Sequence, residues 1–323
     1  SRGRGAVGRQ VMKTGVGSLP ETNGVGQASE PWTVLRVMLW SADYLADKGV
    51  ESARLDAEYL LAHVLGLGRL EMYLQHERQM RPSELDDFRP LLKRRASREP
   101  LQYILGRQAF RDLELDIAPG VLIPRVETEQ LVGAVLEWTE VDGRDSLVGL
   151  DLGTGSGAIA LALLTEGPFH RMVATDISEA ALNAARKNSV SVGFDDRLEL
   201  RLGSLFAPVL TEERFDVVVS NPPYVAESDR DDLPPEVLDW EPHEALFAGA
   251  DGLSMLWKVA AGAAAVLKHR GFLALEVGAG QAGEIASFMD RQIEFEDVRV
   301  RRDLAGMERI VTAVCSHGRD EQG

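Results

Sequence analysis

Two short stretches carry residue types that suit chemistry on a planar nitrogen group. The first is Ser220–Tyr224, in which Asn221 is followed by two prolines and a tyrosine. The apolar run 215–219 precedes it and predicts a buried parallel strand. Because proline has no N–H and a fixed φ, the chain leaves the sheet at Asn221 in a stiff, extended loop. Such a loop holds an amide, unpaired carbonyls and an aromatic face in fixed places; an ordinary strand-end turn is the alternative.

The second stretch is a glycine-rich turn between an expected strand and its helix. Its residues are Asp151, Gly153, Thr154, Gly155, Ser156 and Gly157. Glycines let the backbone turn tightly and bring a ligand against bare peptide groups. Asp176 ends the next expected strand, 25 residues after Asp151. A carboxylate at the carboxyl end of a strand can accept both hydroxyls of a ribose, so this edge of the sheet is the expected ligand position.

An acid at Asp176 fits two cofactors, a dinucleotide or S-adenosylmethionine. The dinucleotide fingerprint is G-x-G-x-x-G, whereas this chain has G-x-G-x-G with Asp151 two residues before the first glycine. A fixed negative charge suits the ammonium of a methionine moiety and opposes a pyrophosphate. The pattern therefore favours the methyl donor S-adenosylmethionine. A helix N-cap role for Asp151 is disfavoured because three glycines follow it.

The expected sheet order brings the two stretches together. The strand that ends at Ser220 lies beside the strand that ends at Asp151, so Asn221 faces the methyl group of the donor. A carboxamide or exocyclic amino nitrogen is a poor nucleophile because its lone pair is delocalised. The Asn221 side-chain oxygen and the Pro222 carbonyl can orient its two N–H bonds while Tyr224 packs on the planar group. We expect Asn221, Pro222 and Tyr224 to be catalytic, and no strong general base is required before transfer.

Alternating strand and helix patterns position these stretches and predict an α/β fold with helices on both faces of a parallel sheet. Strands are expected at 147–151, 171–176, 197–202, 215–220 and 271–277, and helices at 157–165, 178–190 and 252–268. Two final strands, 295–300 and 309–315, are joined through Gly306 and are expected to add antiparallel at one edge. The predicted fold is a doubly wound, mostly parallel, seven-stranded sheet.

The chain before this sheet divides into three parts. Residues 1–30 are interpreted as a disordered basic extension, because the first twenty residues carry four basic side chains and no acid; an organellar transit peptide or an early start codon gives the same pattern. Four helical patterns predict a small bundle at 31–106 without a cluster of chemically useful groups. A β-hairpin linker is expected at 107–126, and the catalytic domain at 127–318.

Composition restricts the class of protein. A net charge of −16 and a pI near 4.9 argue against a partner held through phosphates, because duplex DNA needs a basic footprint. One cysteine, Cys315, excludes an intrachain disulfide and a cysteine-built metal site, and its apolar neighbours indicate a buried thiol. We expect no metal. Nothing approaches 18 uninterrupted apolar residues, so no transmembrane helix is expected.

Several motifs share their order and spacing with one enzyme family. Asp151–Gly157 followed by Asn221–Tyr224 looks like the amino-methyltransferases with an N/D-P-P-Y loop, whose members act on nucleic-acid bases or on protein glutamine amides. The motifs that narrow this group are Glu99–Ile104, Ile123–Glu129, Glu241–Pro242 with Ala245–Leu246, Asp251–Leu253, Glu276–Gly278, and Asp303 with Gly306 and Arg309. Together they resemble the HemK/PrmC family of peptide chain release factor glutamine N5-methyltransferases over roughly residues 32–315.

The resemblance implies a class I S-adenosylmethionine-dependent methyltransferase fold. It implies that the acceptor is the glutamine of the Gly-Gly-Gln motif in class-1 release factors, and that the helical bundle helps to dock them. Matching donor-binding positions run from Gly153 to Gly157 and include Asp176, Leu205 and Asn221; matching glutamine-binding positions are Asn221, Pro222, Pro223 and Tyr224. We expect a cytoplasmic monomer that binds neither a membrane nor nucleic acid.

The chain departs from the family pattern at two positions. Val126 stands where the family usually has proline, which loosens that loop without removing Arg125 or Glu127. Ser204 stands where the family often has an acid near the adenine of the donor, while Leu205 can still supply an apolar wall. The contact to the adenine amino group is therefore open.

Two rival functions remain. A nucleic-acid amino-methyltransferase would use the same loop, but eight acids follow Tyr224 and only Arg230 opposes them, which would repel a phosphate backbone. These acids are Glu227, Asp229, Asp231, Asp232, Glu236, Asp239, Glu241 and Glu244. The alternative interpretation is that each of them is simply a side chain on a solvated loop. The second rival is a protein that binds the donor and the release factor without catalysis.

Overall fold

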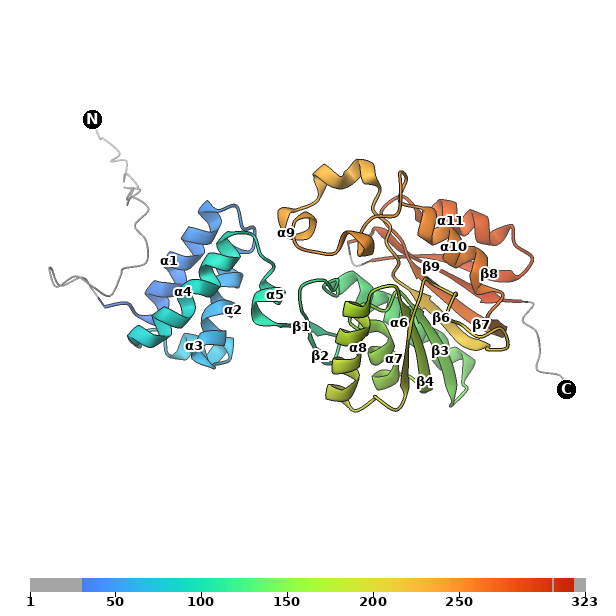
Figure 1. Cartoon of the computed structure of the whole chain (residues 1–323), viewed down its shortest axis with the longest axis horizontal. Helices are drawn as coiled ribbons and strands as arrows, with labels where there is room; N and C mark the ends of the chain where they lie inside the picture. Colours follow the sequence, from blue (N-terminus) through green and yellow to red (C-terminus); the bar gives the residue numbers. More distant parts are fainter. Residues whose placement is uncertain (1–30, 304, 317–323) are drawn as a thin grey trace, which may run out of the picture. The chain divides into compact units, whose positions relative to one another are not determined.

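The computed structural model describes residues 31–303 and 305–316, which pack as two units that divide between Ser97 and Arg98 (Figure 1). The expected disordered extension 1–30 lies outside the described residues. The division falls before the short helix α5 (Leu101–Leu105). Tyr103 explains why α5 belongs with the second unit, since its ring joins the core of that unit and its hydroxyl donates to the Val121 carbonyl at 2.7 Å.

The first unit is a small helical bundle. Its helices are α1 (Val34–Asp47), α2 (Ala53–Leu65), α3 (Arg69–Leu74) and α4 (Pro82–Ala96). Val37, Leu60 and Phe88 are fully buried between them. A polar link crosses this core: the buried Arg95 of α4 donates to the buried Asp56 of α2 at 2.6 Å. Removing one partner of such a buried pair strongly destabilises the fold, because the other charge is left buried without compensation. The pair therefore fixes how α2 and α4 pack.

The second unit contains the expected seven-stranded sheet, in the order β5-β4-β3-β6-β7-β9-β8. The strands are β3 (Leu147–Leu152), β4 (Phe169–Asp176), β5 (Leu198–Leu202), β6 (Phe215–Ser220), β7 (Leu267–Glu276), β8 (Phe295–Arg302) and β9 (Glu308–Cys315). The strands from β5 to β7 are parallel, and β9 joins β7 antiparallel as predicted. Since β6 pairs with β3, the predicted neighbourhood of Ser220 and Asp151 is confirmed.

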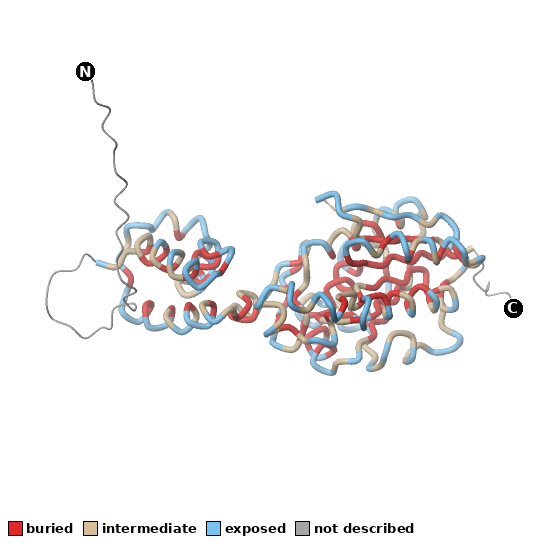
Figure 2. Tube along the Cα trace, turned by 90° about the horizontal axis from the view of Figure 1, so that it is seen from above, coloured by how far each residue is buried: buried red, intermediate tan, exposed pale blue. Residues whose placement is uncertain are grey.

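Helices cover both faces of this sheet (Figure 1). One layer holds α6 (Val126–Asp142), α7 (Ala158–Glu166) and α8 (Glu179–Val192), and the other holds α10 (Ser254–Ala263) and α11 (Ala282–Asp290). Side chains of β6 alternate between the layers, because Val217 and Val219 face the first and Val218 faces the second. The strands are accordingly buried along the middle of the unit (Figure 2).

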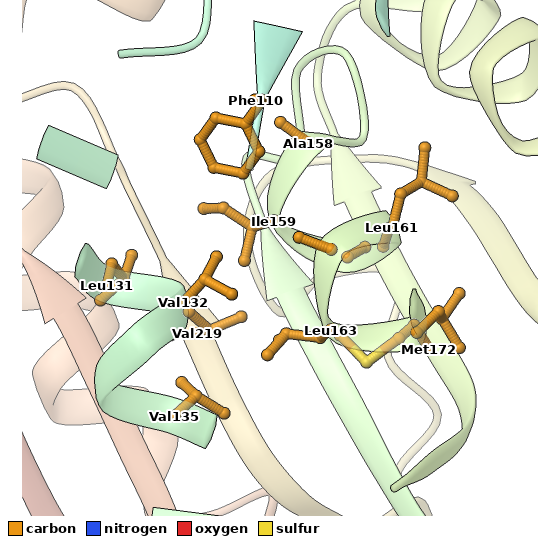
Figure 3. Packing of buried hydrophobic residues seen from close by; sticks show 14 of the residues in the cluster. Phe110, Leu131, Val132, Val135, Ala158, Ile159, Leu161, Leu163, Met172 and Val219 are labelled. Atoms are coloured by element: carbon orange, nitrogen blue, oxygen red, sulfur yellow. The ribbon is translucent and has the colours of Figure 1, made fainter. Parts of the chain in front are cut away.

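The segment expected as a linker forms the predicted hairpin, β1 (Arg107–Phe110) with β2 (Leu113–Asp116). It is packed into the first helical layer: Phe110 lies beside Ala158 and Ile159 of α7 (Figure 3). A second link is polar. The buried Asn188 of α8 accepts from the Asp116 N–H at 2.7 Å and donates to the Ser156 carbonyl at 2.9 Å. The hairpin is thereby tied to the glycine-rich turn.

One expected element is wrong at its boundary. The helix predicted over 252–268 ends at Ala263, and Leu267 already pairs with Phe215 in the sheet. The run from Ala263 to Leu267 is apolar throughout, so periodicity does not separate the end of a buried helix from the start of a buried strand. The register of β7 then shifts near Arg270, which has a φ of 58°.

The acidic loop, residues 226–251, leaves the sheet after β6 and returns before α10. It contains η1 (Glu227–Asp232), α9 (Pro235–Leu238) and η2 (His243–Ala245). Val225 and Phe247 form a parallel bridge that joins its two ends. Cys315 is buried in β9, as predicted. Across residues 31–303 and 305–316, no helix has both the length and the apolar character needed to cross a bilayer.

Candidate active site

A cavity opens at the carboxyl ends of β3, β4 and β6, where ligands of doubly wound sheets bind. It encloses about 690 Å³ of empty space, which includes the open solvent at its mouth. The residues that line it are Gly120, Val121, Leu122, Gly153, Gly155, Asp176, Ile177, Ser178, Ala181, Gly203, Ser204, Leu205, Asn221, Pro223, Pro242, Glu244, Ala245 and Met255. Both stretches singled out from the sequence therefore meet at one cavity.

The glycine-rich turn forms the floor of this cavity. Gly153 and Gly155 line it, with φ values of 73° and 55° that glycine adopts without strain. The N–H groups of Gly153 and Thr154 both donate to the Thr175 carbonyl of β4, at 2.8 and 3.0 Å. A Cβ on Gly157 would come within 3.2 Å of Ala185, which keeps α7 and α8 close. The backbone of the turn is thus held open toward the cavity.

Asp151 lies behind the turn and does not line the cavity. It is fully buried, and one carboxylate oxygen accepts from the Thr154 hydroxyl at 2.7 Å. Its other oxygen finds no hydrogen-bond partner among the described residues. Burial raises the pKa of Asp151 to about 7, and the hydrogen bond from Thr154 only partly opposes this shift.

Asp176 presents a carboxylate at the wall of the cavity. Its oxygens accept from the backbone N–H groups of Gly155 and Ser178, each at 2.9 Å. Burial raises its pKa, these N–H groups hold it back, and the neighbouring charge of Glu244 raises it further. The remaining acceptor capacity of this carboxylate suits a pair of ligand hydroxyls.

The Asn-Pro-Pro-Tyr loop contributes Asn221 and Pro223 to the cavity, while Pro222 is buried behind them. The Asn221 Nδ2 donates to the Thr128 hydroxyl of α6 at 2.9 Å. Tyr224 points away from the cavity lining, toward β7, where its hydroxyl donates to Glu276 at 3.2 Å. Its carbonyl accepts from the Gln281 side chain at 2.9 Å. The loop is therefore held from both sides of the sheet.

Glu276 ends β7 and is a buried acid, with 1% of its surface exposed. Burial raises its pKa to about 7, and the neighbouring hydroxyls of Thr128 and Tyr224 counter only part of that shift. One Glu276 oxygen accepts from Tyr224, and the other has no hydrogen-bond partner among the described residues. The same burial, with the charge of Glu276 beside it, raises the pKa of Tyr224. Asp151 and Glu276 are thus buried acids with raised pKa values in β3 and β7, the two strands that adjoin β6, and such shifts are enriched at functional sites.

Two loops cover the cavity, and Glu241 joins them. This buried residue of the acidic loop accepts from Arg125 at 2.5 Å and from the Ile123 N–H at 3.1 Å. Gly120–Leu122 from the one loop and Pro242 with Glu244 from the other then line the cavity. The order of these motifs was visible in the sequence, but their pairing across more than a hundred residues was not.

The predicted site residues separate into two groups. Those that the structure brings together around the cavity are Gly153, Gly155, Asp176, Leu205, Asn221 and Pro223. Those that lie in the supporting shell behind it are Asp151, Thr154, Ser156, Gly157, Pro222 and Tyr224. Residues missed from the sequence include Ile177 and Met255, whose apolar side chains carry no motif signal. Asn188 was also missed, although a buried amide on an amphipathic helix is a recognisable exception.

Family models match two parts of the chain. The PrmC N-terminal domain matches residues 37–106, and the methyltransferase small domain matches residues 113–239. A solved structure of the hMettl16 catalytic domain in complex with the MAT2A 3'UTR hairpin 6 is similar with a TM-score of 0.51 and 19% identity. It covers 71% of this chain and 83% of that chain, and at this identity it supports the methyltransferase fold alone.

Curated relatives extend over nearly the whole chain. The release factor glutamine methyltransferase of Geobacter sulfurreducens is 41% identical over 282 residues, covering 87% of this chain and 96% of that protein. The enzyme of the same name from Rhodopirellula baltica is 36% identical over 284 residues, with the same coverage of 87% and 96%. The one from Chlorobaculum tepidum is 36% identical over 291 residues. With this identity over this length, the chain belongs to the release factor glutamine methyltransferase family.

Proposed function

We propose that this enzyme transfers the methyl group of S-adenosylmethionine to the side-chain amide nitrogen of the glutamine in the Gly-Gly-Gln motif of class-1 peptide chain release factors. The observation that carries the proposal is the meeting of Asn221 with Gly155 and Asp176 at one cavity. It occurs in a chain that shares 41% identity with a release factor glutamine methyltransferase.

The cavity fits the donor by its chemistry. Asp176 offers carboxylate oxygens to the ribose, and Gly153 and Gly155 present bare backbone to the methionine portion. Leu205 and Met255 supply apolar contacts for the adenine. Asp151 acts through the turn that it supports, by holding the Thr154 hydroxyl. When bound, S-adenosylmethionine supplies an activated methyl group on a sulfonium.

The Asn-Pro-Pro-Tyr loop positions the acceptor nitrogen. The Asn221 side-chain oxygen and the Pro222 carbonyl accept the two N–H bonds of the glutamine amide, which aims its nitrogen at the donor and stabilises the charge that develops there. Pro223 forms part of the wall. Tyr224, with its hydroxyl on Glu276, holds the loop from behind.

The acidic loop favours a protein acceptor over a nucleic acid. Three of the nine acids in residues 226–251 form ion pairs within the unit: Glu236 with Arg98, Glu241 with Arg125, and Glu227 with Arg230. The other six acids are exposed: Asp229, Asp231, Asp232, Asp239, Glu244 and Asp251. Their charge near the mouth of the cavity repels a phosphate backbone. This supports release factor over an RNA hairpin as the acceptor.

The deciding experiment offers both acceptors. The protein is incubated with S-adenosylmethionine carrying a labelled methyl group and with either a class-1 release factor or ribosomal RNA, and the product is mapped by mass spectrometry. We expect one methyl group on the glutamine of the Gly-Gly-Gln motif. Label found in RNA alone would show that the protein is a nucleic-acid amino-methyltransferase instead. Binding of the donor without any methyl transfer would favour a protein that binds the donor and the release factor without catalysis.

A further inference from the structure

Gln281 is a half-buried residue between β7 and α11, and its side chain joins two backbone groups. Its Oε1 accepts from the Gly278 N–H at 2.8 Å, and its Nε2 donates to the Tyr224 carbonyl at 2.9 Å. The Tyr224 hydroxyl donates to Glu276, the last residue of β7, at 3.2 Å. Residues 276–281 therefore hold the end of the Asn-Pro-Pro-Tyr loop by its carbonyl and by its hydroxyl. Gln281 does this from outside the lining of the cavity.

The two backbone partners fix which way the Gln281 amide points. A backbone N–H can only donate and a carbonyl can only accept, so the amide oxygen must face Gly278 and the NH2 must face Tyr224. The reversed amide would set two donors together at Gly278 and two acceptors together at Tyr224. Both ends of the amide are thus in use, and a side chain that only accepts hydrogen bonds cannot replace it.

Backbone encloses the Gln281 amide at both ends. A Cβ on Gly278 would lie 2.7 Å from its Oε1, and a Cβ on Gly252 would lie 2.8 Å from its Nε2. The Gln281 N–H also donates to the Gly278 carbonyl at 3.2 Å, and the residue is the N-cap of α11. The amide is thus packed against main chain, which gives the loop a fixed group to rest on.

Little backbone freedom separates the Tyr224 carbonyl from Asn221. The rings of Pro222 and Pro223 fix two φ angles, and each proline also restricts the residue before it. At the start of the loop, Ser220 is held in the sheet, where its hydroxyl donates to a carbonyl of β3 at 2.7 Å. Because the segment between these two anchors is stiff, a displacement at Tyr224 also moves the Pro222 carbonyl and Asn221.

We propose that Gln281 is a positioning residue for methyl transfer, which holds the Tyr224 carbonyl and thereby places the Pro222 carbonyl and the Asn221 amide against the donor. This inference rests on the proposed function, in which these two groups orient the acceptor nitrogen. Without the Gln281 amide, the loop keeps its proline stiffness but loses the hydrogen bond that sets where it stops. The acceptor nitrogen would then be aimed less accurately at the methyl group.

Two substitutions of nearly the same length test the two ends of the amide. Gln281→Met removes both hydrogen bonds, whereas Gln281→Glu keeps an acceptor for the Gly278 N–H and sets a second acceptor against the Tyr224 carbonyl. Under saturating donor we expect kcat to fall about tenfold to a hundredfold in Gln281→Met, as misplacement of a reacting group does. At mildly alkaline pH, where the new carboxyl is ionised, kcat of Gln281→Glu should fall at least as far. Donor affinity measured by calorimetry should stay that of wild type in both, because Gln281 lies outside the cavity.

Gln292→Met and Gln292→Glu are the matched controls. Gln292 is also half-buried, and it lies two residues past the other end of α11. We expect both of its variants to keep the kcat of wild type. Gln281 variants with the kcat of wild type would overturn the inference. Equal losses in the Gln292 variants would overturn it too, because a general disturbance of α11 would then explain the effect.

A second measurement needs no acceptor, so it separates this inference from the proposed function. Of the five tyrosines, Tyr224 alone precedes a valine. Protein labelled at the tyrosine carbonyl carbon and at the valine nitrogen therefore gives one NMR correlation between such a pair, from Tyr224 to Val225. Losing a hydrogen bond lowers the chemical shift of a carbonyl carbon, so both Gln281 variants should lower it and the Gln292 variants should not.

The two measurements fail independently. An unchanged Tyr224 carbonyl shift in the Gln281 variants would overturn the inference, whichever acceptor the wild type labels. The kinetic comparison uses that acceptor, and the wild-type assay alone decides whether it is release factor.

Discussion

At the residue scale, the cavity depends on a small number of polar atoms that are held by others. The Asn221 amide donates to Thr128, and the Asp176 carboxylate accepts from two backbone N–H groups. Glu241 joins the two loops that cover the cavity. Since each of these groups already has a partner before a ligand binds, little conformational entropy is lost on binding.

Asn221→Ala separates binding from transfer. Removing the amide deprives the acceptor nitrogen of one of its two oxygens, so we expect transfer to fall by about 10²–10³-fold, the loss typical for one oxyanion-type contact. The donor keeps Asp176 and the glycine-rich turn, so its affinity should change by no more than a few-fold. Methyl transfer to release factor and calorimetric donor binding measure the two effects. Asn183→Ala on the exposed face of α8 is the control, and turnover that survives Asn221→Ala would contradict the role of the amide.

The sequence predicted those residues that carry both a special chemistry and a motif. Asn221, Asp176, Gly153 and Gly155 were identified because proline, glycine and strand-end acids restrict the backbone in recognisable ways. The contact of Thr128 with Asn221 could not be predicted, since it joins residues that lie 93 positions apart in the sequence. The burial of Asp151 was likewise not visible, because the pattern shows where a turn lies and not which side of it a carboxylate takes.

At the element scale, two glycines make room for the Asn-Pro-Pro-Tyr loop. A Cβ on Gly252 would lie 2.3 Å from the Tyr224 carbonyl oxygen, and one on Gly278 would lie 3.1 Å from the Tyr224 ring. The loop thus rests against backbone on the side of α10 and α11. Its position depends on the absence of side chains there as much as on hydrogen bonds.

Gly252→Ala tests this close approach, and Gly249→Ala is its matched control. Both glycines have positive φ values, 73° and 82°, so both substitutions carry the same cost of about 1 kcal/mol for a left-handed alanine. Only position 252 adds a clash, since the nearest atom to a Cβ on Gly249 is 3.7 Å away. We expect Gly252→Ala to lower kcat by at least about tenfold beyond Gly249→Ala. Equal rates would mean that the loop adapts without moving Asn221.

The strands were predictable to within two residues for β3, β4, β5 and β6, because each is an apolar run closed by a polar or glycine signal. The start of β7 was not, since Ala263 to Leu267 offers no breaker between a buried helix and a buried strand. The hairpin was predicted from alternation, whereas its burial against α7 required the tertiary structure.

At the scale of the whole molecule, the two units have separate cores, and both core clusters of the second unit consist of residues from Tyr103 onward. Deleting residues 1–97 should therefore leave donor affinity unchanged. If the bundle docks the release factor, transfer to the folded factor should fall by at least about tenfold more than transfer to a short Gly-Gly-Gln peptide, because only the folded factor loses that interface. Equal losses of transfer to the folded factor and to the peptide would show that the bundle does not dock the release factor.

Stability should depend on pH through the two buried acids. The folded pKa of Asp151 and of Glu276 is about 7, well above their ordinary values of 3.8 and 4.5. Each acid therefore stabilises the fold fully below its ordinary pKa, and this contribution is lost as the pH rises to about 7. We expect the melting temperature to fall between pH 5 and pH 7.5, and to fall less in a variant with Asp151→Asn and Glu276→Gln. If the melting temperatures of wild type and of this variant fell with the same slope against pH, the pH dependence would belong to other groups.

The burial of Asp151 and Glu276 has a consequence for what the native state binds. Between about pH 4 and pH 7 the folded chain holds protons on Asp151 and Glu276 that the unfolded chain releases. The hydrogen ion is thus a ligand of this fold by the same thermodynamic linkage as a small molecule. A positive charge near these carboxylates favours their ionised form, so loading the neighbouring cavity with the positively charged sulfonium donor should release protons into the solvent.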